Sequence, residues 1–215
     1  MSSLIGILCL LSALAVTSYA LSCTHCNSEE ATCSGPSMIC PADNQCGTAY
    51  TETSAGGMKS ITLVRSCTPS SQCGYKGTVS IEGAQIRMGT SCCRTDNCTP
   101  NLPSLPTISS NPNGLVCRTC ASADSTWCYT SDTIQCTGDQ NMCLLQTTHV
   151  SGLVSLSTAI RGCATKSICD LVSHSTSEGG VTSEVKFICT SGGLSVHTIV
   201  LTPAIVCLLL LKLFF

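Results

Sequence analysis

The sequence predicts an all-β, disulfide-rich protein built from two copies of one small domain. Three observations carry this prediction: 20 cysteines among 215 residues, a cysteine spacing that occurs twice, and short alternating segments around glycine turns. The first spacing starts at Cys23, reads Cys-x2-Cys-x6-Cys-x6-Cys-x5-Cys-x20-Cys-x5-Cys-x18-Cys, and ends in the doublet of Cys92 and Cys93. The second starts at Cys117 and reads Cys-x2-Cys-x7-Cys-x7-Cys-x6-Cys-x19-Cys-x5-Cys-x19-Cys. Spacings this similar indicate an internal repeat.

Composition points to an extracellular protein. Aromatic residues make up only 4% of the chain, so each small domain buries too little apolar surface to fold without covalent cross-links. Disulfides supply such cross-links and persist outside the reducing cytosol. The net charge of −2 is mixed in sign along the chain, without a basic run. We therefore expect neither nucleic acid nor an anionic membrane surface as a partner.

The order of segments follows from composition. Residues 1–20 are expected to be a signal peptide, because the apolar run 4–16 is followed by small residues at Ser18 and Ala20. That run is too short for a comfortable membrane span, so cleavage is favoured over an uncleaved anchor. The remaining predicted segments are a first domain at 21–98, a proline-rich linker at 99–114, a second domain at 115–191, and a hydrophobic C-terminal propeptide at 192–215. The linker is expected to be semi-stiff, with neither helix nor sheet.

The long gaps between cysteines predict β-hairpins. Apolar and polar residues alternate on both sides of glycine-containing turns, which is the short-range signature of a hairpin. No helical periodicity competes between the signal peptide and the tail. The predicted strand pairs are 48–51 with 60–64, 78–81 with 85–88, 144–149 with 154–160, and 171–173 with 185–188.

The segment Cys92-Cys93-Arg94-Thr95-Asp96-Asn97-Cys98 closes the first domain. Neighbouring cysteines do not sensibly bond to each other, so Cys92 must reach back while Cys93 is close enough to Cys98 to close a short loop. The segment, the spacing and the paired hairpins resemble the three-finger domain of the lymphocyte-antigen-six/urokinase-receptor superfamily. That resemblance covers nearly all of the mature chain in two copies, and it implies three hairpin fingers held by a disulfide knot.

The resemblance also implies a disulfide pairing, whereas sequence alone leaves many connectivities open. The implied pairs are Cys23–Cys46, Cys26–Cys33, Cys40–Cys67, Cys73–Cys92 and Cys93–Cys98 in the first domain, and Cys117–Cys143, Cys120–Cys128, Cys136–Cys163 and Cys169–Cys189 in the second. Two departures from the family pattern stand out. The position after Cys98 is Thr99 instead of asparagine, and the second domain lacks the closing doublet, so only one disulfide is expected to hold its last strand.

The C-terminal segment resembles a glycolipid-anchor signal. Small residues at 191–193, a short spacer at 194–198 and an apolar tail at 199–215 meet the requirements for exchange onto a GPI anchor. The attachment residue is expected to be Ser191 or Gly192. The alternative is a transmembrane helix, which the length just allows. Removing both end segments discards Cys9 and Cys207 and leaves eighteen cysteines that can all pair.

Other chemical signals are weak. His25, His149 and His174 have no companion acids in sequence, so we expect no catalytic or metal role. Cys23 and Cys26 have the spacing of a zinc or redox pair, but the same spacing recurs within the disulfide ladder. Asn97 lies in the glycosylation sequon Asn97-Cys98-Thr99. Trp127 is expected to be a core residue instead of a contact residue.

These observations favour a non-enzymatic, GPI-anchored module on the outer face of the plasma membrane, without a cofactor, that binds an extracellular protein. The alternative is a secreted inhibitor of phospholipase A2, because the tandem modules resemble gamma-type inhibitors of these enzymes. In three-finger domains the contact surface comes from hairpin faces and tips. Alternate strand residues face opposite sides, so some apolar residues of the middle fingers are expected to face solvent. Tyr50 and Leu145 are the predicted ligand-binding residues.

Overall fold

The computed structural model describes residues 20–171, 173–178 and 180–192. They form two similar, disulfide-rich β domains in tandem, which confirms the predicted fold class. The predicted signal peptide, except Ala20, and the predicted propeptide, except Gly192, lie outside the described residues. No helix among the described residues is long and apolar enough to cross a membrane.

The first domain contains three fingers. The second finger is the hairpin of β4 and β5, and the third is the hairpin of β6 and β7; both turn at glycines with positive φ, which L side chains rarely adopt. The first finger is short: β1 pairs with β3, and β2 joins the edge of β5. The strands are β1 (Ser22–Thr24), β2 (Cys26–Ser28), β3 (Ser37–Ile39), β4 (Asn44–Ala55), β5 (Met58–Pro69), β6 (Lys76–Ile81) and β7 (Ala84–Cys93).

The second domain repeats this plan. Its middle strand β11 pairs with β12 on one side and with β14 on the other, and β13 adds to β14. The strands are β8 (Pro112–Arg118), β9 (Cys120–Ser122), β10 (Thr133–Thr137), β11 (Met142–Ser151), β12 (Leu156–Ala164), β13 (His174–Glu178) and β14 (Val181–Thr190). Although this domain lacks the closing doublet, β14 pairs with β11 from Thr182 to Thr190, so the ladder as well as Cys169–Cys189 holds the strand.

Two short helical turns differ from the sequence expectation. The 3₁₀ turn η1 (Ser70–Gln72) follows β5, and α2 (Lys166–Cys169) follows β12. The prediction of a strand at 171–173 was wrong for residues 171 and 173, which lie outside the strands, because β13 starts only at His174. Ile168 on α2 is fully buried and packs in a core cluster with Val79, Leu144 and Ala164, so this single turn is stabilised by tertiary packing.

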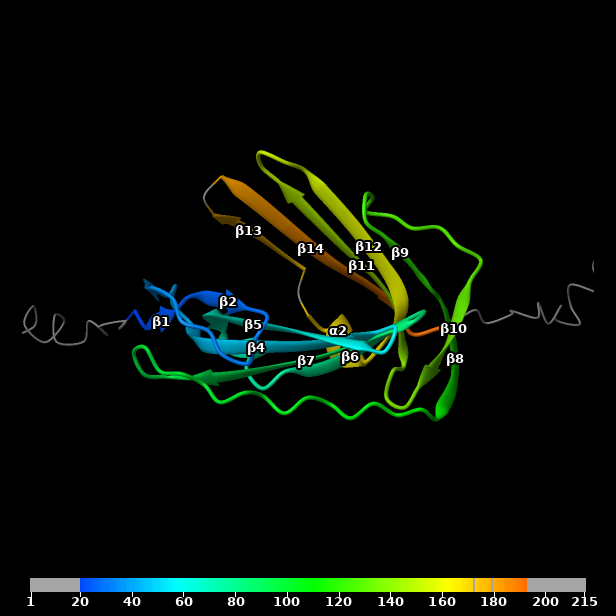
Figure 1. Ribbon diagram of the computed structural model, residues 1–215, viewed down its shortest axis with the longest axis horizontal. Helices are drawn as coiled ribbons and strands as arrows, with labels where there is room; N and C mark the ends of the chain where they lie inside the picture. The colour runs from blue at the N-terminus through cyan, green and yellow to red at the C-terminus, as the bar shows by residue number, and fades with distance from the viewer. Residues whose placement is uncertain (1–19, 172, 179, 193–215) are drawn as a thin grey trace, which may run out of the picture.

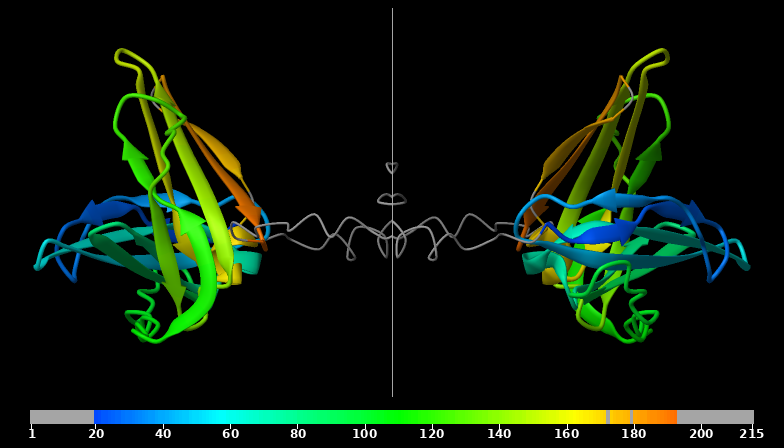
Figure 2. Two further views of the ribbon diagram at one scale, coloured as in Figure 1. Left: turned by 90° about the vertical axis from the view of Figure 1, so that its right-hand side faces the viewer. Right: turned by 90° about the vertical axis from the view of Figure 1, so that its left-hand side faces the viewer.

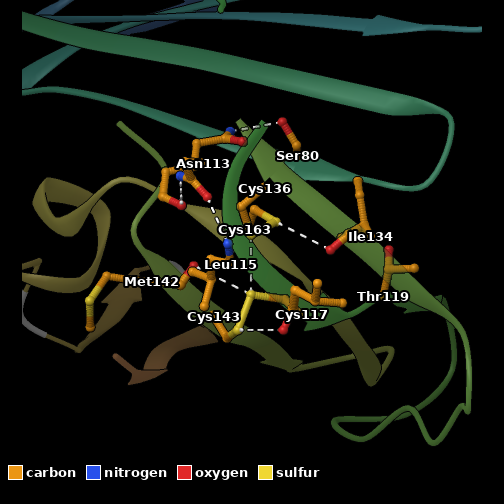
Figure 3. Close-up of a disulfide and its surroundings, with 12 residues drawn as sticks. Ser80, Asn113, Leu115, Cys117, Thr119, Ile134, Cys136, Met142, Cys143 and Cys163 are labelled. Atoms are coloured by element: carbon orange, nitrogen blue, oxygen red, sulfur yellow. Dashed lines mark hydrogen bonds between the residues drawn. A yellow bond between two sulfur atoms is a disulfide. The ribbon is translucent and has the colours of Figure 1, made fainter. Parts of the chain in front are cut away.

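The described residues contain nine disulfides, which are the pairs that the family resemblance implies. In the second domain, Cys117–Cys143 and Cys136–Cys163 lie close together (Figure 3), with the sulfur atoms of Cys117 and Cys136 3.3 Å apart. Each domain thus has a separate buried cystine cluster at the base of its fingers.

The two domains share one β-sheet. The sheet of ten strands runs β13-β14-β11-β12-β6-β7-β4-β5-β2, with β9 also on β12, so β12 of the second domain pairs with β6 of the first. Thr78 and Thr165 reinforce the junction, since the Thr165 amide donates to the Thr78 carbonyl at 3.0 Å and the Thr78 amide donates to Thr165 Oγ1 at 3.1 Å. The fingers of the second domain rise from this junction at a steep angle to those of the first (Figures 1 and 2).

The predicted linker packs along the first domain. Figure 1 shows it as the green coil beneath β7. Ser91 Oγ donates to the Asn101 carbonyl, and Arg87 Nη1 donates to the Pro106 carbonyl at 3.4 Å. The expectation of no sheet was wrong for residues 112–114, because β8 begins at Pro112. Proline is tolerated there since it is the first residue of a strand that pairs only with β10.

Candidate protein-binding surface

The outer face of the second domain carries a row of side chains across four strands. Ile188 on β14, Leu145 on β11, Arg161 on β12 and Cys120 on β9 are successive register partners. Antiparallel partners project from the same face of a sheet. The opposite face carries Leu144 and packs in the core cluster that includes Val79 of the first domain. The row is therefore on the side turned away from the domain junction.

The loop between β9 and β10 covers part of this row. The disulfide Cys120–Cys128 ties the loop to the sheet, and Cys128 packs with Leu145 and Ala159. The neighbouring Trp127 lies over the Arg161 guanidinium, whose Cζ is 4.3 Å from the ring centroid. Trp127 is 55% exposed, so its assignment to the core was wrong. Cys128 packs inward instead of Trp127, and a cation–π contact holds the indole on the surface.

A second aromatic–arginine pair lies in the same loop region. Tyr129 is 85% exposed, and Cζ of Arg118 on β8 lies 6.0 Å from its ring centroid. Nη1 of Arg118 donates to the Thr130 carbonyl, which fixes the guanidinium against the loop. Two arginines and two exposed aromatic rings thus lie at one end of the second domain.

Trp127 and both arginines line a groove of about 320 Å³, which we call the Trp127 groove. Its floor includes Leu145, and its apolar side is Ile188, which is 53% exposed. Trp, Tyr and Arg are the residue types enriched where binding energy concentrates in protein interfaces. The groove lies on strands cross-linked by disulfides, which positions its side chains before a partner arrives. The residues that line it are Val116, Cys117, Arg118, Trp127, Cys143, Leu144, Leu145, Arg161, Ile188, Thr190 and Gly192.

Comparison with known proteins identifies the family. The model of the u-PAR/Ly-6 domain matches residues 19–101 and residues 113–197. The chain belongs to the u-PAR/Ly-6 domain family.

Two proteins named as phospholipase A2 inhibitors align with most of the chain. It is 29% identical over 174 residues to the phospholipase A2 inhibitor 25 kDa subunit of Naja kaouthia, covering 79% of this chain and 94% of that protein. It is 29% identical over 167 residues to the phospholipase A2 inhibitor NAI of Notechis ater, covering 76% of this chain and 83% of that protein. The urokinase plasminogen activator surface receptor of Bos taurus is 38% identical over 84 residues, which are 36% of this chain and 24% of the receptor. The relatives are thus inhibitors and a receptor.

The two predicted ligand-binding residues occupy different u-PAR/Ly-6 domains and are not brought together. Leu145 lies at the floor of the Trp127 groove, but it is only 7% exposed, so the expectation that it faces solvent was wrong. The reason is that the loop carrying Cys128 covers it. Tyr50 is half-buried and lies in register with Gly89. Pro103 of the linker lies over Gly89, so the linker runs along the face that Tyr50 occupies.

Sequence reasoning did not identify Arg161 and Ile188 as surface residues of this groove. Trp127, the only tryptophan in the sequence, was singled out but assigned to the core. Nothing in the sequence indicates that Arg161 lies beneath it, since the contact depends on the path of the loop between β9 and β10.

The described residues show no constellation for catalysis. His149 Nδ1 lies 2.9 Å from Ser157 Oγ on the next strand, and no described acidic side chain hydrogen-bonds to this histidine. His25 Nδ1 contacts Met38 Sδ at 3.2 Å. The side chain of His174 lies outside the described residues. The sulfur atoms of Cys23, Cys40 and Cys67 lie within 4.8 Å of one another, but all three belong to disulfides and are not free to bind a metal ion.

The predicted modification sites are exposed. Asn97 is in the loop that closes the first domain, has φ of 53°, and accepts a hydrogen bond at Oδ1 from Ser37 Oγ at 2.6 Å. Ser191 and Gly192 follow directly after β14. Glycosylation of Asn97 and anchor attachment at Ser191 or Gly192 remain predictions.

Proposed function

We propose that the chain is a non-enzymatic, cell-surface protein that binds an extracellular protein ligand through the Trp127 groove. The observation that carries this proposal is the exposed indole of Trp127 on Arg161, beside the exposed Ile188, over disulfide-linked strands. An exposed apolar and aromatic patch rimmed by polar groups is where a protein partner is expected. The proposal places the contact in the second domain instead of the middle finger of the first.

A GPI anchor at Ser191 or Gly192 would hold this groove near the membrane. Support comes from the position of Gly192, which follows β14 and lines the groove. Partners that reach the groove would then approach along the membrane surface.

Anchoring is tested by expressing the full chain in animal cells and treating them with phosphatidylinositol-specific phospholipase C. Release of the protein into the medium is the expected result. Retention on the membrane with an intact Phe215 terminus would contradict the anchor and support a spanning helix. Secretion without treatment would support a soluble protein.

The second candidate function is inhibition of a secreted phospholipase A2. It is favoured by the relatives named as phospholipase A2 inhibitors, of which the alignments cover 94% and 83%. The test adds the mature protein, purified from the expressing cells, to secreted phospholipase A2 enzymes acting on phospholipid vesicles. Loss of hydrolysis with the wild type, but not with Trp127→Ala, would establish inhibition through the groove. Unchanged hydrolysis with every enzyme leaves the receptor function as the better proposal.

Binding through the groove is tested directly by comparing the wild-type protein with the Trp127→Ala variant. Fluorescent wild-type protein is expected to bind to cells that display the ligand, and Trp127→Ala is expected to lose this binding while remaining folded. Tyr50→Ala, a change in the face along which the linker runs, serves as the control. If Tyr50→Ala removes binding and Trp127→Ala does not, the contact lies on the first domain.

A further inference from the structure

Two arginines of the Trp127 groove lack an acidic partner. Arg118 and Arg161 both line the groove. Among the described residues, no carboxylate oxygen lies within 4.0 Å of either guanidinium, and the ion pairs that do form involve other basic residues. Partly buried positive charge without a counter-charge is unfavourable, because the surroundings replace water with groups of lower polarity.

Arg161 is also short of hydrogen-bond acceptors. None of the hydrogen bonds between described residues uses its guanidinium, and its Nε is buried without a partner. Buried polar atoms in native proteins are nearly always satisfied, so an unsatisfied one calls for an explanation. The Nη atoms of Arg161 are not among the buried atoms and have no partner among the described residues either, so a ligand that brings an acceptor into the groove would bond to them.

The loop between β9 and β10 orients both guanidinium groups. Trp127 occupies one face of the Arg161 guanidinium, and Nη1 of Arg118 donates to the Thr130 carbonyl. Stacking occupies the flat face of a guanidinium and leaves its N–H edge able to donate to a carboxylate. The arginines are thus held in place before binding, which lowers the entropy lost when a ligand docks.

Apolar side chains line much of the rest of the groove. Ile188 is exposed beside Leu145, and Val116 lies near Arg118 along the lining. A ligand with two functions fits this arrangement: an acceptor for the arginines and an apolar group for Ile188. A polyanion does not fit it as well, because the chain has no basic run and a net charge of −2.

We propose that the Trp127 groove receives an acidic side chain of the protein ligand, with the carboxylate between Arg118 and Arg161 and a neighbouring apolar side chain on Ile188. This inference rests on the proposed binding function and specifies the chemistry of the partner. It predicts that the ligand presents Asp or Glu next to a large apolar residue on an exposed loop.

The single tryptophan makes the test direct, because intrinsic fluorescence then reports from Trp127 alone. The probes are two synthetic cyclic peptides that differ at one position, one with Glu between Leu and Phe and the other with Gln. With the mature protein, the Glu peptide is expected to change the emission saturably, and the Gln peptide is expected to bind about tenfold more weakly, because bonds to charged groups are the stronger ones. Raising the salt concentration is expected to weaken binding of the Glu peptide more than that of the Gln peptide.

Variants assign the effect to the arginines. Arg118→Gln leaves the contact between Trp127 and Arg161 in place, so it tests the charge without changing the fluorophore's neighbour. Arg118→Gln is expected to reduce the preference for the Glu peptide over the Gln peptide severalfold. Arg161→Gln is expected to reduce this preference further. Ile188→Ser is expected to weaken both peptides equally, and Arg94→Gln, on an exposed loop of the first domain, is the control.

Three outcomes would overturn the inference: equal binding of the two peptides, a preference unchanged in both arginine variants, or no binding of the Glu peptide at about 1 mM. An emission change with phosphatidylserine vesicles, and none with the peptides, would instead indicate a lipid surface. If Trp127→Ala abolishes binding to ligand-displaying cells while the peptides show no preference, the proposed function stands and only the acidic-ligand inference fails.

Discussion

Gly162 on β12 lies against the carbonyl oxygen of Ser80 on β6, across the junction of the two domains. A Cβ atom at Gly162 would lie 2.1 Å from that oxygen and 2.9 Å from Ile81 Cγ2. The oxygen belongs to the backbone and cannot rotate away, so the close approach requires glycine. Because Cys163 pairs with Ser80 in the next ladder position, this contact is part of what joins the domains into one sheet.

Gly162→Val is expected to disrupt the pairing of β6 with β12. Forcing extra atoms into a packed site costs about 1–3 kcal/mol, which for a protein of this size lowers the melting temperature by about 2–4 °C per kcal/mol. Calorimetry measures the shift, and hydrogen exchange at Ser80 and Cys163 measures loss of the junction. Ala121→Val, at an exposed position of β9, is the control. An unchanged melting temperature with unchanged exchange would mean that the junction does not depend on this approach.

Gln140→Ala is expected to destabilise the same junction, because it removes buried hydrogen bonds between the two domains. Nε2 of Gln140 donates to Thr78 Oγ1 at 3.2 Å and to Ser80 Oγ at 2.7 Å, and all three residues are buried. Removing the donor leaves buried hydroxyl groups unsatisfied, at a cost of about 1–3 kcal/mol. Urea unfolding measures the loss. The exposed Gln135 provides the matched control, since Gln135→Ala is expected to change stability by less than about 0.5 kcal/mol.

Glu52 is expected to contribute a pH-dependent part of the stability. The hydrogen bond from Arg87, at 2.5 Å, lowers the pKa of Glu52 below its ordinary value of 4.5, and the charges of Arg87 and Lys59 act in the same direction. A pKa lowered by folding means that the stabilisation is complete above the unfolded-state pKa and is lost as the pH falls through the folded-state value.

Melting temperatures measured from about pH 6 to pH 2 should therefore fall less steeply in Glu52→Gln than in the wild type, with the difference confined to the region below about pH 4.5. Glu82→Gln, which removes an exposed carboxylate outside the ion pairs of the described residues, is the control for loss of one charge. Parallel curves for Glu52→Gln and the wild type would show that this ion pair does not couple stability to pH.

Leu145 and Ile188 form a matched pair for separating folding from binding. They are direct register partners on β11 and β14, yet Leu145 is 7% exposed and Ile188 is 53% exposed. Leu145→Asp buries a charge against Cys128 and Ala159, so it is expected to block folding and secretion. Ile188→Asp is expected to be secreted and folded but defective in ligand binding. Secretion is measured by immunoblot; a well-secreted Leu145→Asp protein would contradict the packing described for the groove floor.

Much of the architecture could be predicted from the sequence because it depends on local spacing. The repeated cysteine intervals indicate two domains, and alternation around Gly56, Gly83 and Gly152 indicates the hairpins that form. The family resemblance supplied the disulfide pairs. Pro112 shows the limit of such rules: proline argued against sheet, but a first strand position with one partner strand accommodates it.

The sequence by itself determined the two-domain, disulfide-linked β architecture, whereas only the tertiary structure decided which faces of its strands are open to a partner. Leu144 and Leu145 show why. They point to opposite faces of β11, and alternation predicts that one of them faces solvent. Both are buried, because the first domain covers the side of Leu144 and the loop carrying Cys128 covers Leu145. That same loop leaves Trp127 exposed on Arg161. Which strand face is buried in this way depends on contacts between residues far apart in the chain. The alternation of residues along a single strand does not reveal these contacts.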